Sequence, residues 1–151
     1  MSYFTNLLIL SLFGCLSLSE GQCVCPQWVL TEKQKTCLPN LSFSGVVEIT
    51  SPAESCPDTD KFKCSDIKVL ESFKKTIEAD SIKTVRSFSE CGPSMPSSGT
   101  FIITGYSGTK EGSITLSGCN SIVIEVSGLE DPKVSEYREY ANDCENEKES
   151  D

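Results

Sequence analysis

The sequence predicts a small, mainly β domain, either a barrel or a sandwich, with a helix near its C-terminal end. The strands are predicted by segments of alternating or β-branched residues that follow one another between turn signals. An even set of cysteines, which remains once an apolar leader is removed, predicts that disulfides link the domain. A capped, amphipathic segment close to the end predicts the helix. The chain has 151 residues, a length typical of one domain.

Residues 1–22 have the features of a secretory signal peptide. The apolar segment "LLILSLFG" is too short to span a bilayer, and small residues follow it. We expect the signal to end between residues 19 and 22. The sequence therefore predicts a secreted protein of the extracellular space, with no membrane insertion.

The cysteine count predicts a disulfide framework. Of nine cysteines, Cys15 lies in the leader, so eight remain in the mature chain, and no CxxC pair that would suggest a metal site occurs among them. Eight cysteines allow 105 pairings, and the count alone does not choose among them. The eight are Cys23, Cys25, Cys37, Cys56, Cys64, Cys91, Cys119 and Cys144.

Composition excludes several classes of function. The chain has no histidine, which excludes histidine-based catalytic triads and dyads and the usual zinc enzymes. Its formal charge of −9 argues against nucleic acid or an anionic membrane as a partner. No pair of carboxylates stands out as a glycosidase site. We expect a protein that is not an enzyme and that has no cofactor or metal of its own.

Five strands are predicted in order. The first covers 41–49, where Phe43 and Val47 share a face and Gly45 marks a bulge or a sharp bend. The turn-rich connector 51–61 follows. The other strands are 62–73, whose register we expect to shift once, 81–88, 100–106 and 113–119, with a proline-rich loop at 91–99 and a turn at 107–112.

The predicted helix begins after Asp131, a good N-cap, with Pro132 at its first position. Val134, Tyr137 and Ala141 recur on one helical face, so we expect them to pack on the sheet. The helix is predicted to end near Cys144, leaving residues 145–151 as an acidic, solvated tail.

The order of these pieces resembles the netrin-like domain, in particular the N-terminal inhibitory domain of the tissue inhibitors of metalloproteinases. The pieces are a signal, "CVC", a third cysteine twelve residues on, "FSGVV", "CG", "GTFIITG", "GSITLSGC", a helix and a final cysteine. The similarity covers residues 23–144. It implies an OB-fold, which is a five-stranded Greek-key barrel with flanking helices.

The resemblance also implies a pairing of the cysteines. Cys23 would bond Cys91, Cys25 would bond Cys119, and Cys37 would bond Cys144. Two cysteines are extra to the family's set, and they would form a local bridge between the first two strands, Cys56 with Cys64. Larger members of the family carry a second domain with six further cysteines, whereas this chain stops just past Cys144, so activities tied to that domain are not expected.

In the resembled inhibitors the mature chain begins at the first cysteine. Its α-amine and carbonyl chelate the catalytic zinc of a protease and displace the water that would attack the substrate. The resemblance therefore implies that Cys23 ligates the zinc of an extracellular metalloprotease. Val24 would enter the pocket for the substrate side chain after the scissile bond, and as a small side chain it would underfill a deep pocket.

The same resemblance implies a contact edge for the protease. It comprises two segments joined by the Cys23–Cys91 bridge, and Glu90 is an unusual residue there because a carboxylate could repel acidic neighbours. The segments are Cys23, Val24, Cys25 and Pro26, and Ser87, Phe88, Ser89, Glu90 and Cys91.

Two alternatives remain open at the N-terminus. Cleavage after Gln22 frees the amine of Cys23, whereas cleavage after Gly21 fits the small-residue rule better and leaves Gln22 in front of it. In the second case the domain would be a non-inhibitory binding module for a matrix or signalling protein. We expect a monomer in either case, with Asn40 of "NLS" as a glycosylation site and Trp28 as either a core residue or an exposed contact.

Overall fold

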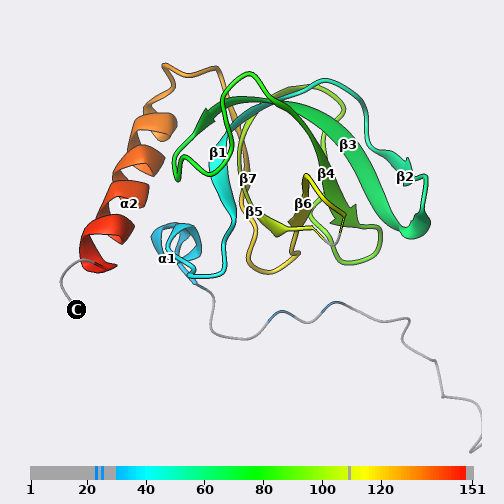
Figure 1. Ribbon diagram of the computed structural model, residues 1–151, viewed down its shortest axis with the longest axis horizontal. Coiled ribbons are helices and arrows are strands. Elements are labelled where there is room, and N and C mark those ends of the chain that lie inside the picture. Colours follow the sequence, from blue (N-terminus) through cyan, green and yellow to red (C-terminus); the bar gives the residue numbers. More distant parts are fainter. Residues whose placement is uncertain (1–22, 24, 26–29, 109, 149–151) are drawn as a thin grey trace, which may run out of the picture.

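The computed structural model describes residues 23, 25, 30–108 and 110–148. It contains two helices and seven strands, and Figure 1 shows α2 on one side of the sheet and β2 on the other. The elements are α1 (Glu32–Thr36), β1 (Phe43–Ile49), β2 (Glu54–Cys56), β3 (Thr59–Ser72), β4 (Ile82–Phe88), β5 (Gly99–Ser107), β6 (Ser113–Leu116), β7 (Val123–Val126) and α2 (Pro132–Lys148).

Five of the strands close into a barrel, as the resemblance implied, whereas the strand pattern alone had left a barrel and a sandwich open. Their order around the barrel is β1-β3-β4-β6-β5, and pairing of β1 with β5 completes the ring. The β4–β6 pair is parallel and the other four pairs are antiparallel. This arrangement is an OB-fold-like barrel. The short strands β2 and β7 lie outside the ring, paired with β3 and β5.

The barrel strands alternate between two hydrophobic cores. In β1, Phe43, Val47 and Ile49 fill the barrel interior, where Val85 and Leu116 also lie. The residues between them on each strand face outward. Some of these residues form a second, outer core, which lies between the barrel wall and α2. Its members are Val46, Phe73, Ile102, Ile122, Val126, Val134, Tyr137 and Ala141.

The predicted register shift occurs in β3. Val46 pairs with Glu71 and the next residue, Val47, pairs with Val69, so Leu70 has no partner on β1. Such an extra residue is a β-bulge, which bends the strand and helps the sheet to close. Gly45 beside it allows the close approach, because a Cβ there would lie 2.1 Å from the carbonyl oxygen of Glu71.

The C-terminal helix begins as predicted. The backbone N–H of Lys133 donates to Asp131 Oδ1 at 3.0 Å, which makes Asp131 the N-cap, and Tyr137 is fully buried. The helix continues past Cys144 to Lys148, so the predicted end was wrong and part of the expected tail is helical. Cys144 still bonds Cys37, which joins α2 to the C-cap of α1.

Three elements were not predicted. The strand β2 lies within the segment that we expected to be a connector, and β7 was not predicted at all. The helix α1 is a single turn with a capping box between Thr31 and Gln34. In addition, β6 ends at Leu116, three residues earlier than predicted. The Cys56–Cys64 bridge is present, but we predicted the wrong pair of strands for it. It joins β2 to β3 and does not join the first two barrel strands.

Candidate functional site

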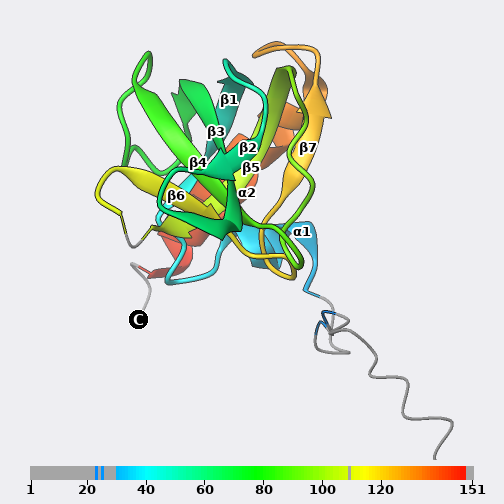
Figure 2. The ribbon, with the colours of Figure 1, turned by 90° about the vertical axis from the view of Figure 1, so that its right-hand side faces the viewer.

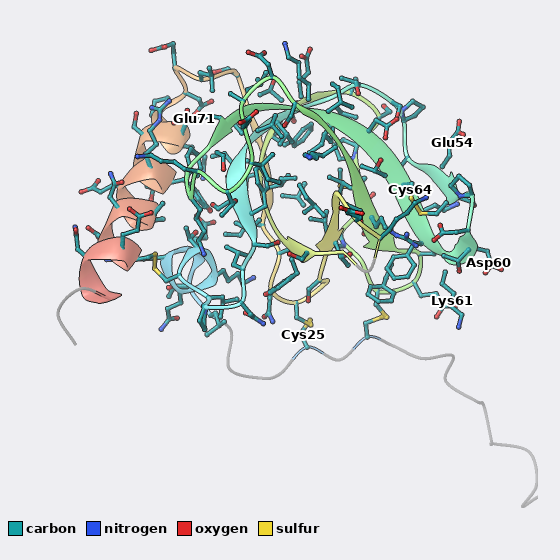
Figure 3. All side chains as sticks on the ribbon, viewed as in Figure 1. Cys25, Glu54, Asp60, Lys61, Cys64 and Glu71 are labelled. Atoms are coloured by element: carbon teal, nitrogen blue, oxygen red, sulfur yellow. A yellow bond between two sulfur atoms is a disulfide. The ribbon has the colours of Figure 1, made fainter. Side chains whose placement is uncertain are left out.

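Two disulfides tether the start of the described chain to the barrel. Cys23 bonds Cys91 with 5.5 Å between their Cα atoms, and Cys25 bonds Cys119 with 5.4 Å. Together with Cys37–Cys144 these are the three pairs that the resemblance implies, and the two cysteines outside the family's set form the fourth pair, Cys56–Cys64. Both Cys23 and Cys25 are exposed, and Cys25 lies below the barrel in Figure 3.

The two partner cysteines are held close together by glycines. A Cβ on Gly118 would lie 1.7 Å from the carbonyl oxygen of Cys91, and a Cβ on Gly92 would lie 2.0 Å from Ser87 Oγ. Only glycine permits these approaches. The "CG" and "SGC" motifs therefore bring the loop after β4 against the turn after β6, and the anchors of Cys23 and Cys25 become neighbours.

The segment Ser87–Cys91 comprises the last two residues of β4 and the turn that follows, and its last residue, Cys91, is bonded to Cys23. Ser87 is buried, and its hydroxyl donates to the carbonyl oxygen of Pro93 at 2.8 Å. Ser89 donates its backbone N–H to Lys61 O at 2.8 Å and its hydroxyl to Asp60 O at 2.9 Å. These bonds fix the segment to the hairpin between β2 and β3, so this half of the predicted contact edge is rigid.

Phe88 presents apolar surface on this edge. It is 45% exposed, and its ring centroid lies 4.3 Å from that of Phe62 on the paired strand. The guanidinium of Arg86 also packs on the ring of Phe62, 4.8 Å from its centroid. Arg86 in turn donates to Asp58 at 2.9 Å, and this hydrogen bond holds the pKa of Asp58 below its ordinary value. The ring of Phe62 therefore makes a cation–π contact with a buried arginine, which helps to hold the aromatic pair in place.

A cleft of about 400 Å³ opens next to the disulfide of Cys23. Glu90, which the sequence identified as unusual, lines it together with Asp60, so two carboxylates and the ammonium of Lys61 border one hollow. Figure 3 shows Asp60 and Lys61 at the tip of the β2–β3 hairpin. The remaining lining residues are Phe88, Ser89 and Cys91.

Some of the predicted site residues lie outside the described residues. Val24, Pro26 and Trp28 are among them, so the choice between core and contact for Trp28 stays open. Asn40 is described and exposed, directly before the buried Leu41. A surface position is what a glycosylation site requires, and glycosylation of Asn40 remains a prediction.

Within residues 23, 25, 30–108 and 110–148, no group of three or more His, Cys, Asp or Glu residues could hold a metal ion. Over the same part of the chain, none of the helices combines the length and apolar character needed to span a membrane. Four disulfides are typical of proteins from an oxidising compartment.

No protein-family model matches this chain, and no curated protein matches it.

The contribution of the β2–β3 hairpin to this edge was missed from the sequence. Asp60 and Lys61 lie 30 residues before Glu90 and Cys91, and no local pattern connects the two segments. The cysteine pair Cys56 and Cys64 was an available signal, because a disulfide requires its two Cα atoms to be close, so a bridge across eight positions makes the chain fold back on itself.

Proposed function

We propose that this protein is a secreted inhibitor of zinc metalloendopeptidases that chelates the protease zinc through the α-amine and carbonyl of Cys23. The observation that carries the proposal is the double tether: Cys23 and Cys25 are exposed and bonded to two loops that touch at Cys91 and Gly118. An N-terminal segment anchored in this way loses little conformational entropy when it enters a protease cleft.

The chemistry of the amine suits the role. A free α-amine has a pKa near 7.7–8.0, so a substantial fraction is neutral and able to ligate at physiological pH. Amine and carbonyl of one residue form a five-membered chelate ring, which occupies the zinc position that water needs for hydrolysis. Because a proton competes with zinc for the amine, inhibition should weaken as the pH falls below 7.

The rigid segment beside Cys23 supplies the second half of the proposed interface. Exposed Phe88 offers apolar contact, and Ser89 is fixed by its hydrogen bonds to the hairpin. Asp60 and Glu90 make the rim acidic around Lys61. We therefore expect the best targets to be proteases whose cleft borders carry lysine or arginine at the matching place.

The deciding experiment begins with the N-terminus. The protein is secreted from eukaryotic cells with its own signal, and its intact mass and N-terminal sequence are determined. If the chain starts at Cys23 with a free amine, we expect stoichiometric inhibition of at least one zinc metalloendopeptidase in a fluorogenic peptide assay. A start at Gln22 or earlier would contradict chelation by Cys23 and favour the non-inhibitory binding module.

The matched control is a chain with one alanine added before Cys23. It keeps every disulfide but moves the amine away from the zinc. We expect its inhibition constant to rise by roughly a hundredfold or more, equivalent to about 2.7 kcal/mol. Equal inhibition by the extended chain would exclude the proposed chelation, even if the protein binds the protease in another way.

A further inference from the structure

A cavity of about 470 Å³ lies at one end of the barrel, where β1, β4 and β6 begin and β5 ends. We call it the barrel-end cavity. The Cys23 edge is at the opposite end, because β4 leads to Cys91 and β6 leads to Cys119. Figure 2 shows β4 and β6, two of the strands that begin at the cavity, next to each other. The lining includes Ser42, Thr76, Ile77, Lys83, Glu111 and Ile114.

The floor of the barrel-end cavity is apolar. Ile114, at the start of β6, is 2% exposed and belongs to the interior core of the barrel. Ile77, from the loop between β3 and β4, is partly buried and packs against the same core. Two residues earlier, Lys75 has a φ of +54°, a backbone conformation that is uncommon outside glycine and that is often found beside ligand sites. An apolar side chain of a ligand would be removed from water on this floor.

Lys83 lies on the interior face of β4 at this end of the barrel. It is two residues before Val85 and directly opposite Ile67 on β3, and both of those side chains belong to the interior core. Residues two apart on a strand share a face, and so do paired residues, which places Lys83 on the interior face too. Lys83 is half-buried and forms no ion pair with any residue that the structure describes. A cation over an apolar floor without a counter-ion favours an anionic group of a ligand.

Glu111 supplies the opposite charge. It lies on the turn before β6, and β6 runs parallel to β4 with Ser113 opposite Thr84, so Glu111 and Lys83 are on neighbouring stretches of chain. Glu111 is exposed, and no ion pair joins it to Lys83 or to another described cation. Among the described lining residues these two are the only charged ones. The cavity therefore offers one ammonium and one carboxylate, both available to a ligand.

Hydrogen bonds hold the rim of the cavity in place. Thr76 Oγ1 donates to the carbonyl oxygen of Ser42 at 2.7 Å, which joins the loop after β3 to the start of β1. On the other side, Ser113 Oγ donates to the carbonyl oxygen of Lys110 at 2.7 Å, and the N–H of Gly108 donates to that of Ser113 at 2.9 Å. Both sides of the opening are thus fixed before a ligand arrives, so little conformational freedom is lost on binding.

A short peptide with free ends matches this combination of groups. As a zwitterion it has a carboxylate for Lys83 and an ammonium for Glu111, and its side chains can cover the apolar floor. Its net charge is zero, as is that of the lining, so the charge of −9 on the whole chain does not repel it. The volume is within the range of about 300–1,000 Å³ that is typical of small-molecule sites. We propose that the barrel-end cavity binds a short aliphatic peptide through both of its charged ends.

This proposal does not rest on zinc chelation by Cys23. The barrel-end cavity shares no lining residue with the cleft beside Cys91. An alanine added before Cys23, which moves the amine away from a protease zinc, is therefore expected to leave peptide binding unchanged. The two proposals can fail separately.

The test follows backbone amide chemical shifts of the full, oxidised, ¹⁵N-labelled protein. The probes are dileucine, divaline and trileucine with free ends, dileucine with both ends blocked by acetylation and amidation, and phosphocholine. We expect a free peptide to shift the amides of Thr76, Lys83 and Ile114, and the blocked dileucine to bind at least tenfold more weakly than the free one. The proposal is overturned if no free peptide shifts these amides or if blocked and free dileucine bind equally. It is also overturned if phosphocholine alone shifts them, which would indicate a different zwitterion as the ligand.

Two variants test the charged groups. Lys83→Met removes the ammonium but keeps an unbranched side chain, and Glu111→Gln removes the charge without changing the shape. Each should weaken dileucine binding by roughly tenfold, because a hydrogen bond to a charged group is lost. The matched controls are Lys63→Met on β3 and Glu125→Gln on β7, exposed strand residues outside the cavity, which should bind as the wild type does. Equal affinity of all these proteins would place binding elsewhere and overturn the proposal.

Peptides blocked at one end identify which charge meets which end. Amidation of the dileucine carboxylate should weaken binding to the wild type but cause no further loss in Lys83→Met. Acetylation of its amine should likewise cause no further loss in Glu111→Gln. The same spectra show whether each variant is folded. Losses that are equal in the wild type and in the variants would mean that other groups hold the ends, and the proposal would be wrong.

Discussion

Single residues determine the shape of the Cys23 edge. Gly118 lies against the carbonyl of Cys91, and Gly92 lies against Ser87, so the two anchoring disulfides share one compact base. From the sequence, both glycines were visible as parts of the "CG" and "SGC" motifs. Their role was not, because a close approach between positions 91 and 118 depends on how the chain closes into the barrel.

The first prediction concerns Gly118→Ala. A Cβ 1.7 Å from the Cys91 oxygen forces the two loops apart, so we expect the free energy of unfolding to fall by about 2 kcal/mol or more. The control is Gly112→Ala, where a Cβ meets nothing within 4 Å and only the positive φ of +76° opposes alanine. We expect a cost of about 1 kcal/mol there. Urea denaturation of both variants would measure the difference, and equal costs would contradict the steric explanation.

At the level of the elements, Asp131 makes the start of α2 sensitive to pH. The backbone N–H groups of Ser127 and Lys133 donate to its carboxylate, and these bonds lower its pKa from the ordinary value of 3.8. A carboxyl group with a lowered pKa stabilises the fold above its ordinary pKa. This contribution is lost as the pH falls through the lower folded value.

The second prediction follows from the lowered pKa of Asp131. Asp131→Asn keeps one side-chain oxygen but loses the carboxylate, so the variant should unfold at a lower urea concentration than the wild type at pH 7. The gap between the two midpoints should close as the pH falls to about 2, where the wild-type carboxylate is protonated too. Glu130→Gln is the neighbouring control. A gap that stays constant with pH would contradict the assigned role.

The third prediction concerns β2. This strand pairs only with β3 and lies outside the barrel ring, and the Cys56–Cys64 bridge fastens it. Replacing both cysteines by serine should cost about 2–3 kcal/mol for a loop of this size. We expect the barrel to remain, with amide shift changes confined to segment 51–66. Collapse of the whole spectrum would mean that β2 is part of the barrel's folding unit.

The five barrel strands could be predicted from sequence, β2 could not, and β7 and α1 were overlooked although their patterns were present. Strands β1, β4 and β5 contain alternating or β-branched runs whose inner residues, such as Phe43 and Val85, fill the barrel. In contrast, β2 has three residues whose strand state depends on a disulfide and on pairing with β3. The segment "IVIEV" of β7 did carry a strand pattern, and "TEKQ" before Cys37 did carry a capping box.

On the scale of the whole molecule, three disulfides span most of the domain. They join residues 68, 94 and 107 positions apart, and α2 is attached to the rest of the fold by the longest of them. Closing loops of these lengths stabilises a folded chain by about 4–5 kcal/mol each in the chain-entropy model. Together they are comparable with the total stability of an ordinary domain, about 5–15 kcal/mol.

The fourth prediction is that reduction unfolds the domain. After treatment with dithiothreitol at 37 °C without denaturant, we expect the dispersed amide spectrum to collapse and the cysteines to become open to alkylation. The same sample without reductant should keep its spectrum and show no alkylation. A reduced protein that stays folded would mean that the two hydrophobic cores suffice without the bridges.

Closure of the barrel by the β1–β5 pair has a further consequence for how the protein behaves when crowded. Among the described strands, the ends of the sheet path and its side branch are β7 with four residues and β2 with three. Short edges of this kind offer little unpaired backbone for another copy to extend. In a crowded, oxidising environment the oxidised fold is therefore a poor template for edge-to-edge aggregation.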